Sequence, residues 1–192
     1  MDATQSLLNP HCHGMQEHPS AVTERAKLLA LQTSIDSGSS ALDPLSLHLS
    51  LGLAYTVGSA IGSKPPSTES CLAAFVSPNS VGLTAGARAW SKHGHRSQPQ
   101  DTPSEVDATK ASAGWWGTPS GPVSVINERA LALFWKVMNA ATWRNLHWLP
   151  HQILVYEVRV AEGYGMRWST ERRRDARMAP PWICRAHDGG WP

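Results

Sequence analysis

Residues 127–169, NERALALFWKVMNAATWRNLHWLPHQILVYEVRVAEGYGMRWS, decide the fold because they carry nearly all of the regular hydrophobic periodicity in the chain. Apolar side chains recur at helical spacing from Ile126 to Ala141, and more apolar residues beside them widen the stripe. Ser124 and Asn127 are both suitable N-caps for this helix. The segment therefore begins with a helix that needs one broad apolar face covered.

Three strands are predicted after the helix. The first covers 142–149, and the Pro150 turn separates it from a second strand at 153–160. In the second strand the apolar residues alternate with Glu157 and Arg159, as in a strand that buries one face. A third strand follows at 164–169. One helix packed on a small antiparallel β-meander is an α+β fold.

Composition places the folded core in the second half of the 192-residue chain, whose length fits one domain with tails. Up to position 111 there are 7 Lys and Arg against 9 Asp and Glu, a balance of −2, and the remainder has 10 against 6, a balance of +4. Eight of the nine tryptophans lie after position 111, and only Trp90 precedes it. Buried aromatic residues dominate core energetics, so the core is expected there.

The domain organisation follows from these patterns. Residues 1–111 are expected to be mostly disordered, with a short helix near 20–35 and a leucine-alternating segment at 45–55. Residues 112–170 are expected to form the small α+β domain. Residues 171–192 form an irregular basic tail.

The cysteines and the apolar runs limit the cellular setting. Cys12, Cys71 and Cys184 are widely spaced and form no CxxC pair, which argues against a disulfide framework and suits the nucleus or the cytoplasm. No apolar run is long enough for a membrane span. The sequence predicts no cofactor and no metal, since His11-Cys12-His13 has no standard zinc-site spacing.

A second pattern lies in the segment LSLHLSLGL, where leucine occupies every second position: Leu45, Leu47, Leu49, Leu51 and Leu53. It resembles the LxLxL repression motif with which plant transcriptional regulators recruit Topless-type corepressors. That resemblance implies an extended segment docking on a protein partner. The alternative is an ordinary half-buried strand, since a period of two is what any strand shows.

Two groups of residues are candidates for a ligand site. Trp143, Arg144, Tyr156, Arg167 and Trp168 can line one sheet face as a surface for an acidic or planar ligand. The alternative is that the aromatic residues are core and the arginines form its rim.

The possible acid–base groups near the core are His147, His151, Tyr156, Glu157 and Glu162. Sequence spacing gives no pairing among them, and catalysis depends on spatial proximity. No catalytic residue is therefore assigned from the sequence.

The segments SAGWWGTPSGPV, INERALALFW, TWRNLHWLPHQILVYEVRV and EGYGMRWS together resemble an uncharacterised plant protein family. That resemblance implies a further strand and an ending of the Met-Glu-Asp-Gly-His type. The chain departs from this after Ser169, although a shift of one nucleotide in 186–192 would give Pro-Thr-Met-Glu-Asp-Gly. The hypothesis is that roughly the last 15–20 residues are out of frame through a frameshift or alternative splicing.

The sequence favours a non-enzymatic protein-interaction role, regulatory through the LxLxL-type segment and a corepressor-like partner. The alternative is a small-ligand-binding or enzymatic domain that uses the Trp/Arg/His sheet face. Nucleic-acid binding is disfavoured, because Glu171 and Asp175 interrupt the basic run that begins at Arg172.

Overall fold

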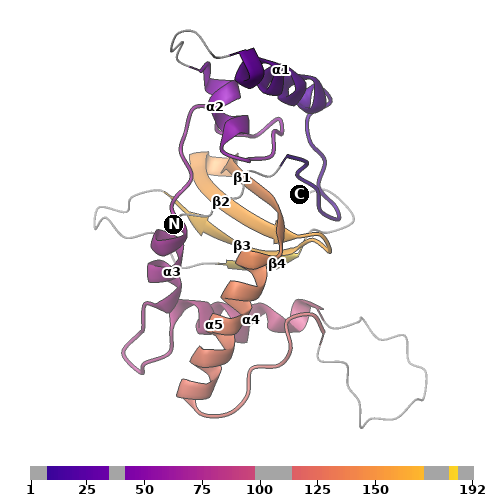
Figure 1. Cartoon of the computed structure of the whole chain (residues 1–192). Helices are drawn as coiled ribbons and strands as arrows, with labels where there is room; N and C mark the ends of the chain where they lie inside the picture. Colours follow the sequence, from indigo (N-terminus) through magenta and orange to yellow (C-terminus); the bar gives the residue numbers. More distant parts are fainter. Residues whose placement is uncertain (1–7, 35–41, 98–113, 171–181, 186–192) are drawn as a thin grey trace, which may run out of the picture.

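The computed structural model describes residues 8–34, 42–97, 114–170 and 182–185, which form helices on both sides of one sheet (Figure 1). In chain order the elements are α1 (Ala21–Ser34), α2 (Pro44–Ser50), α3 (Thr68–Val76), α4 (Ala85–His93), the 3-10 helix η1 (Gly94–Ser97), α5 (Val123–Asn139), β1 (Ala141–Leu149), the 3-10 turn η2 (Pro150–Gln152), β2 (Ile153–Val160), β3 (Tyr164–Ser169) and β4 (Trp182–Arg185).

The α+β prediction is confirmed: α5 leads into an antiparallel meander with the strand order β1-β2-β3-β4. The register pairs Asn145 with Glu157, and Glu157 with Arg167. Residues paired directly across antiparallel strands point to the same face of the sheet. A bulge between Ala141 and Trp143 adds one residue to β1 and leaves this alignment intact further along the strand.

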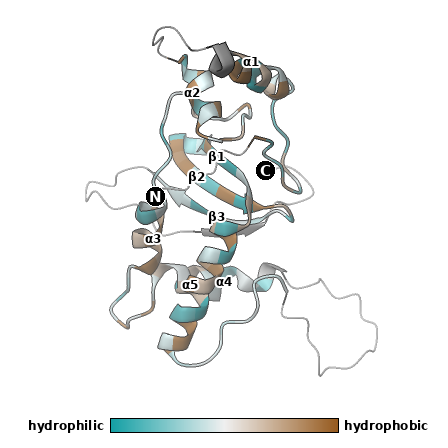
Figure 2. Cartoon of the chain, in the orientation of Figure 1, coloured by the Kyte–Doolittle hydropathy of each residue, from teal (hydrophilic) through white to brown (hydrophobic). Residues whose placement is uncertain are grey.

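The two faces of the sheet differ in chemistry, and Figure 2 shows hydrophobic and hydrophilic residues alternating along the strands. One face presents Leu146, Tyr156, Val158, Met166 and Trp168 to the main core, where α5 and α3 supply Phe134 and Phe75 with ring centroids 5.1 Å apart. The other face carries the polar residues of the strands. The N-terminal segment packs on it through Cys12, which contacts Trp143.

α1 forms where the sequence predicted a short helix near 20–35, and α2, α3 and α4 form in the remainder of a region that was expected to be mostly disordered. Two of these helices have side-chain N-caps: the hydroxyl oxygens of Ser67 and Thr84 accept hydrogen bonds from backbone N–H groups in the first turns of α3 and α4. These helices have nine residues each, too short to be stable alone in water. Tertiary burial stabilises them, and this half supplies to the main core Leu53, Ala60, Cys71, Phe75, Ala87 and Trp90.

The leucine-alternating segment is not extended, as its period of two suggested. Asp43 accepts hydrogen bonds from the backbone N–H groups of Leu45 and Ser46, and Pro44 occupies the first helical turn. These two signals start α2 and outweigh the alternating pattern. Within this segment Leu49 and Leu53 are buried, so they serve the interior of the protein.

The stretch at 54–60 covers the outer edge of β1. Ala54 donates to the Arg144 carbonyl at 2.7 Å, Ala60 donates to the Leu146 carbonyl at 2.7 Å, and Trp148 donates to the Gly58 carbonyl at 2.9 Å. An edge strand left unpaired would offer these groups to another chain. The N-terminal half therefore completes the sheet that the second half begins.

The far edge is closed by β4, which pairs with β3 over Tyr164–Arg185 and Arg167–Trp182. The tail shows no strand pattern in its sequence, because the four residues of β4 are too few to show alternation. The basic run at 172–174 and the tail after 185 lie outside the described residues.

Substituting Gly86 by Ala tests the packing of α3 on α4. A Cβ on Gly86 would overlap the buried Phe75 ring. We expect G86A to cost about 1–3 kcal/mol of unfolding free energy through overpacking, although alanine favours helix formation. Urea denaturation measures it. The control is G58A, whose Cβ would lie 3.7 Å from the nearest heavy atom, the Trp148 carbonyl oxygen, in ordinary contact. A G86A protein as stable as G58A would show that α3 and α4 do not pack as described.

Candidate functional site

The polar face of the sheet, defined by Asn145, His147, Glu157, Arg159 and Arg167, is the candidate functional site. Two of its members sit on β1, two on β2 and one on β3. Strand alternation and register bring them onto one face although they are up to 22 positions apart, from 145 to 167. A polar cluster inside a sheet requires internal partners, because water cannot satisfy it.

Glu157 and Arg159 form a buried ion pair at the centre of this face. Arg159 Nη2 lies 2.7 Å from Glu157 Oε1, and both side chains are almost fully inaccessible, at 0% and 1%. Arg159 Nη1 also donates to the Gly163 carbonyl at 2.6 Å. The guanidinium is thus held by a carboxylate and by a backbone carbonyl, and this fixes the orientation of Glu157.

Gly165 provides the space in which Arg159 lies. The two residues pair across β2 and β3, and a Cβ on Gly165 would lie 2.6 Å from Arg159 Cγ. No side chain larger than hydrogen fits at that position without moving Arg159. That Cβ would also lie 2.2 Å from the Val158 carbonyl oxygen, so glycine at 165 allows the close approach of the β2 backbone as well as of the buried arginine.

His147 stands next to Glu157 at the more open side of the face. Its Nε2 lies 3.2 Å from Glu157 Oε2, and 13% of the side chain is accessible. The separation is that of an ion pair, but the ring nitrogen makes no aligned hydrogen bond in this geometry. His147 is therefore beside a fixed carboxylate and still reachable from solvent.

The N-terminal half forms a wall of this face. Asn145 Nδ2 donates to Thr56 Oγ1 at 3.2 Å, and the Ser59 hydroxyl donates to Asn145 Oδ1 at 3.1 Å.

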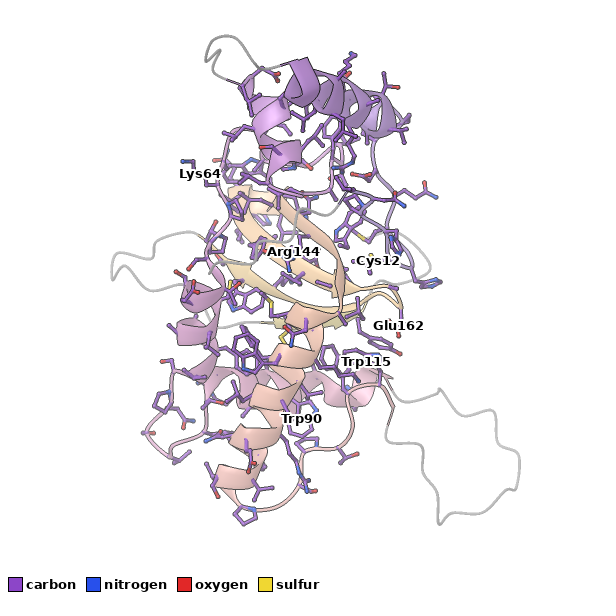
Figure 3. All side chains as sticks on the ribbon, viewed as in Figure 1. Cys12, Lys64, Trp90, Trp115, Arg144 and Glu162 are labelled. Atoms are coloured by element: carbon purple, nitrogen blue, oxygen red, sulfur yellow. The ribbon has the colours of Figure 1, made fainter. Side chains whose placement is uncertain are left out.

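Cys12 packs with Ala54 and Trp143, and Figure 3 shows Cys12 beside the sheet. Burial raises the pKa of the Cys12 thiol to about 12, with Arg159 opposing and Glu157 adding to the shift. The thiol is therefore protonated at neutral pH.

The face carries a second guanidinium beside the buried ion pair. Arg159 is fully buried and engaged by Glu157, whereas Arg167 lies on the neighbouring strand. Arg167 is half-buried on β3, directly across from Glu157. Planar guanidinium groups match phosphate and carboxylate oxygens, and a histidine beside a carboxylate can accept or donate a proton. The arrangement suits proton transfer next to a bound anion.

The ligand face proposed from the sequence is divided by the structure. Trp143 and Arg167 lie on the polar face, whereas Arg144, Tyr156 and Trp168 belong to the opposite face that packs on the main core. Adjacent residues of a strand point to opposite faces, so Trp143 and Arg144 are separated. Tyr156 and Trp168 are directly paired and therefore share the core face. Burial raises the pKa of Tyr156 above its usual range, so its hydroxyl stays protonated in the interior.

Of the acid–base candidates named from the sequence, the structure brings together His147 and Glu157. His151 and Glu162 are exposed in the turns before and after β2, and Figure 3 places Glu162 at an end of the sheet. The pairing becomes readable only after the register of β1 with β2 is known. Asn145, the residue that ties the face to the N-terminal half, carried no signal in the sequence.

A separate buried histidine lies in α2. His48 is fully buried and its Nε2 lies 2.9 Å from the Ala54 carbonyl oxygen. Burial lowers the pKa of His48, so the ring is neutral and serves the packing of α2.

Within the ranges that the structure describes, no group of three or more His, Cys, Asp or Glu side chains is placed to hold a metal ion. None of the described helices is long and apolar enough to cross a membrane.

The polar face lies inside a segment that matches a known protein family. The family described as the CdiA C-terminal tRNase toxin domain matches residues 74–174, which are 101 of the 192 residues. The chain belongs to this family. Beyond it, no curated protein and no solved structure matches the chain.

Membership in the CdiA C-terminal tRNase toxin domain family corrects several expectations from the sequence. It overturns the plant-family resemblance, and the frameshift hypothesis loses its basis because it rested on the ending of that family. A tRNase is an enzyme, so the predicted non-enzymatic interaction role is wrong. The interpretation of the leucine-alternating segment as a corepressor-docking motif is wrong for the same reason; its residues are Leu45, Leu47, Leu49, Leu51 and Leu53. The alternative, an enzymatic domain using the sheet face, agrees better with the match.

Replacing Arg159 by Leu tests whether the buried pair organises the site. The change leaves the Glu157 carboxylate buried without its guanidinium, and we expect a loss of about 3–5 kcal/mol in unfolding free energy. The control is Lys27→Leu, which removes the exposed Lys27–Glu24 pair and should cost less than about 1 kcal/mol. Urea denaturation at neutral pH compares the two variants. Equal losses in both would contradict a structural role for the buried pair.

Proposed function

We propose that this protein is a ribonuclease that cleaves tRNA and that the polar face is its active site. The family match supports tRNA as the substrate, and all five residues of the polar face lie within residues 74–174. This proposal replaces the sequence-based expectation against nucleic acid. The observation that carries it is the placement of His147, whose side chain is 13% accessible, 3.2 Å from the buried Glu157 carboxylate.

His147 transfers the proton in this proposal. Its Nε2 side faces Glu157, so the other ring nitrogen, Nδ1, is left for the substrate. The Glu157 carboxylate orients the ring and stabilises the imidazolium that forms when the ring takes a proton. Glu157 is 1% accessible and acts through His147, which makes it a positioning residue.

The two arginines have different tasks. Arg159 is engaged by Glu157 and by the Gly163 carbonyl, so it holds the carboxylate in place. Arg167 is more accessible and lies on the neighbouring strand, where its guanidinium can contact a phosphate oxygen. A fixed cation beside a reacting phosphate stabilises the charge that builds up in the transition state.

The chemistry uses the nucleophile that RNA itself carries, the ribose 2′-hydroxyl. His147 takes the 2′-hydroxyl proton, and the 2′-oxygen forms a bond to the adjacent phosphorus. The bond from phosphorus to the 5′-oxygen breaks, and that oxygen takes a proton from water. The products are a 2′,3′-cyclic phosphate and a 5′-hydroxyl, and the imidazolium returns its proton to solvent.

Paired histidine substitutions test the assignment. We expect His147→Asn to lower the rate of tRNA cleavage by about 10²–10⁴-fold, the usual contribution of a positioned acid–base group. The control is His151→Asn, an exposed position with φ of 65°, where asparagine keeps the backbone relaxed. Gel analysis of purified tRNA incubated with each protein measures the rates, and thermal unfolding confirms that both variants fold. Equal activity in the two variants would rule out His147 as the group that moves the proton.

A further inference from the structure

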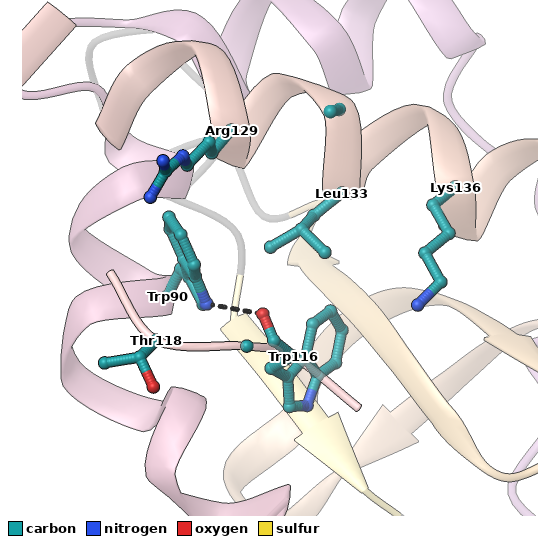
Figure 4. A pocket seen from close by; sticks show the side chains of 8 residues that line it. Trp90, Trp116, Thr118, Arg129, Leu133 and Lys136 are labelled. Atoms are coloured by element: carbon teal, nitrogen blue, oxygen red, sulfur yellow. Dashed lines mark hydrogen bonds between the residues drawn. The ribbon is translucent and has the colours of Figure 1, made fainter. Parts of the chain in front are cut away.

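The strongest feature outside the polar face is a cavity of about 380 Å³ between α5 and the turn at 114–118. Its lining includes Trp90, Trp116, Leu133, Arg129 and Lys136, and Figure 4 shows the α5 side chains projecting toward the two tryptophans. α5 packs on the face of the sheet opposite to the polar face. This α5 cavity is therefore a separate site. Its volume lies within the range of small-ligand sites, about 300–1,000 Å³.

The floor of the α5 cavity is apolar and preformed. The Trp90 indole N–H donates to the Trp116 carbonyl at 3.0 Å, which fixes the Trp90 ring beside the cavity (Figure 4). Trp116 packs edge-on against Trp115, with ring centroids 4.6 Å apart, and Trp115 stacks on Tyr164 at 4.9 Å. Trp90 and Trp116 are almost fully buried, at 3% and 2% exposed, so they form an apolar floor and offer little ring surface for stacking.

The rim of the α5 cavity is cationic. Arg129 and Lys136 lie two turns apart on α5, and both line the cavity. Lys136 Nζ lies 3.6 Å from the centroid of the Trp115 ring and 3.4 Å from the Trp115 carbonyl oxygen, and Arg129 Nη1 lies 3.5 Å from the Ser120 hydroxyl. In the part of the chain that the structure describes, neither cation forms a salt bridge. No carboxylate is among the described residues that line the cavity.

We propose that the α5 cavity binds one nucleotide of the RNA substrate, with the base against the apolar floor beside Leu133 and a phosphate between Arg129 and Lys136. The inference rests on the proposed ribonuclease function and adds a second contact on the other side of the sheet. Charge complementarity carries it: among the described residues, Arg129 and Lys136 have no carboxylate partner and flank an apolar hollow, and nucleotides combine an anion with a flat, largely apolar base. The site contributes affinity for RNA and leaves the chemical step unchanged.

Steady-state cleavage of tRNA by Arg129→Ala/Lys136→Ala tests the proposal. We expect KM to rise about tenfold with kcat within about twofold, and the slope of log KM against log salt to fall by about 2. The control is Lys64→Ala/Arg88→Ala, which also removes two exposed cations, and Figure 3 places Lys64 near α2, away from Trp90. An unchanged KM in the cavity variant, or an equal rise in the control, would overturn the α5 cavity as an RNA contact.

Tryptophan fluorescence separates this inference from the proposed function. Titration of the wild-type chain with 5′-AMP is expected to change the tryptophan emission at a lower concentration than titration with adenosine or ribose 5-phosphate. Adenosine lacks the phosphate, and ribose 5-phosphate lacks the base. The Arg129→Ala/Lys136→Ala variant is expected to bind AMP about tenfold more weakly. AMP binding that is equally tight in this variant would refute the α5 cavity as the nucleotide-binding site. A wild-type chain that binds AMP in this way but does not cleave tRNA would refute the ribonuclease function alone.

Discussion

The buried ion pair between Glu157 and Arg159 is the constraint on which the polar face depends. Charges of this kind are costly to bury, and they persist only when each is matched at close range. Here Arg159 meets the carboxylate at 2.7 Å and the Gly163 carbonyl at 2.6 Å, and the glycine at 165 leaves the space for its side chain. A carboxylate fixed in this way holds the neighbouring His147 at a defined place on the sheet.

The second constraint is the way in which the N-terminal half closes the sheet. Residues 54–60 satisfy the open backbone groups of β1, and Thr56 and Ser59 bind the side chain of Asn145 on the polar face. The family match begins at residue 74, so this wall lies outside the matched segment. The site is consequently built from two parts of the chain, and its geometry depends on both.

The meander was predictable from the sequence because its strands alternate and its turns carry Pro150 and Gly163. The alternation also placed Glu157 and Arg159 together on one side of β2, as observed. The approach of His147 to Glu157 was not predictable, since it depends on the register between β1 and β2. The helices α2, α3 and α4 escaped prediction because they are short and depend on burying Leu49, Phe75 and Trp90 in contacts distant in sequence.

The central claim is that His147 activates the ribose 2′-hydroxyl on the polar face, and the chemical nature of the cleaved ends tests it most directly. Mass spectrometry of the tRNA fragments released by the wild-type chain should show a 2′,3′-cyclic phosphate on one fragment and a 5′-hydroxyl on the other. Fragments that end in a 3′-hydroxyl and a 5′-phosphate would mean that water is the nucleophile. That result would contradict the role assigned to His147.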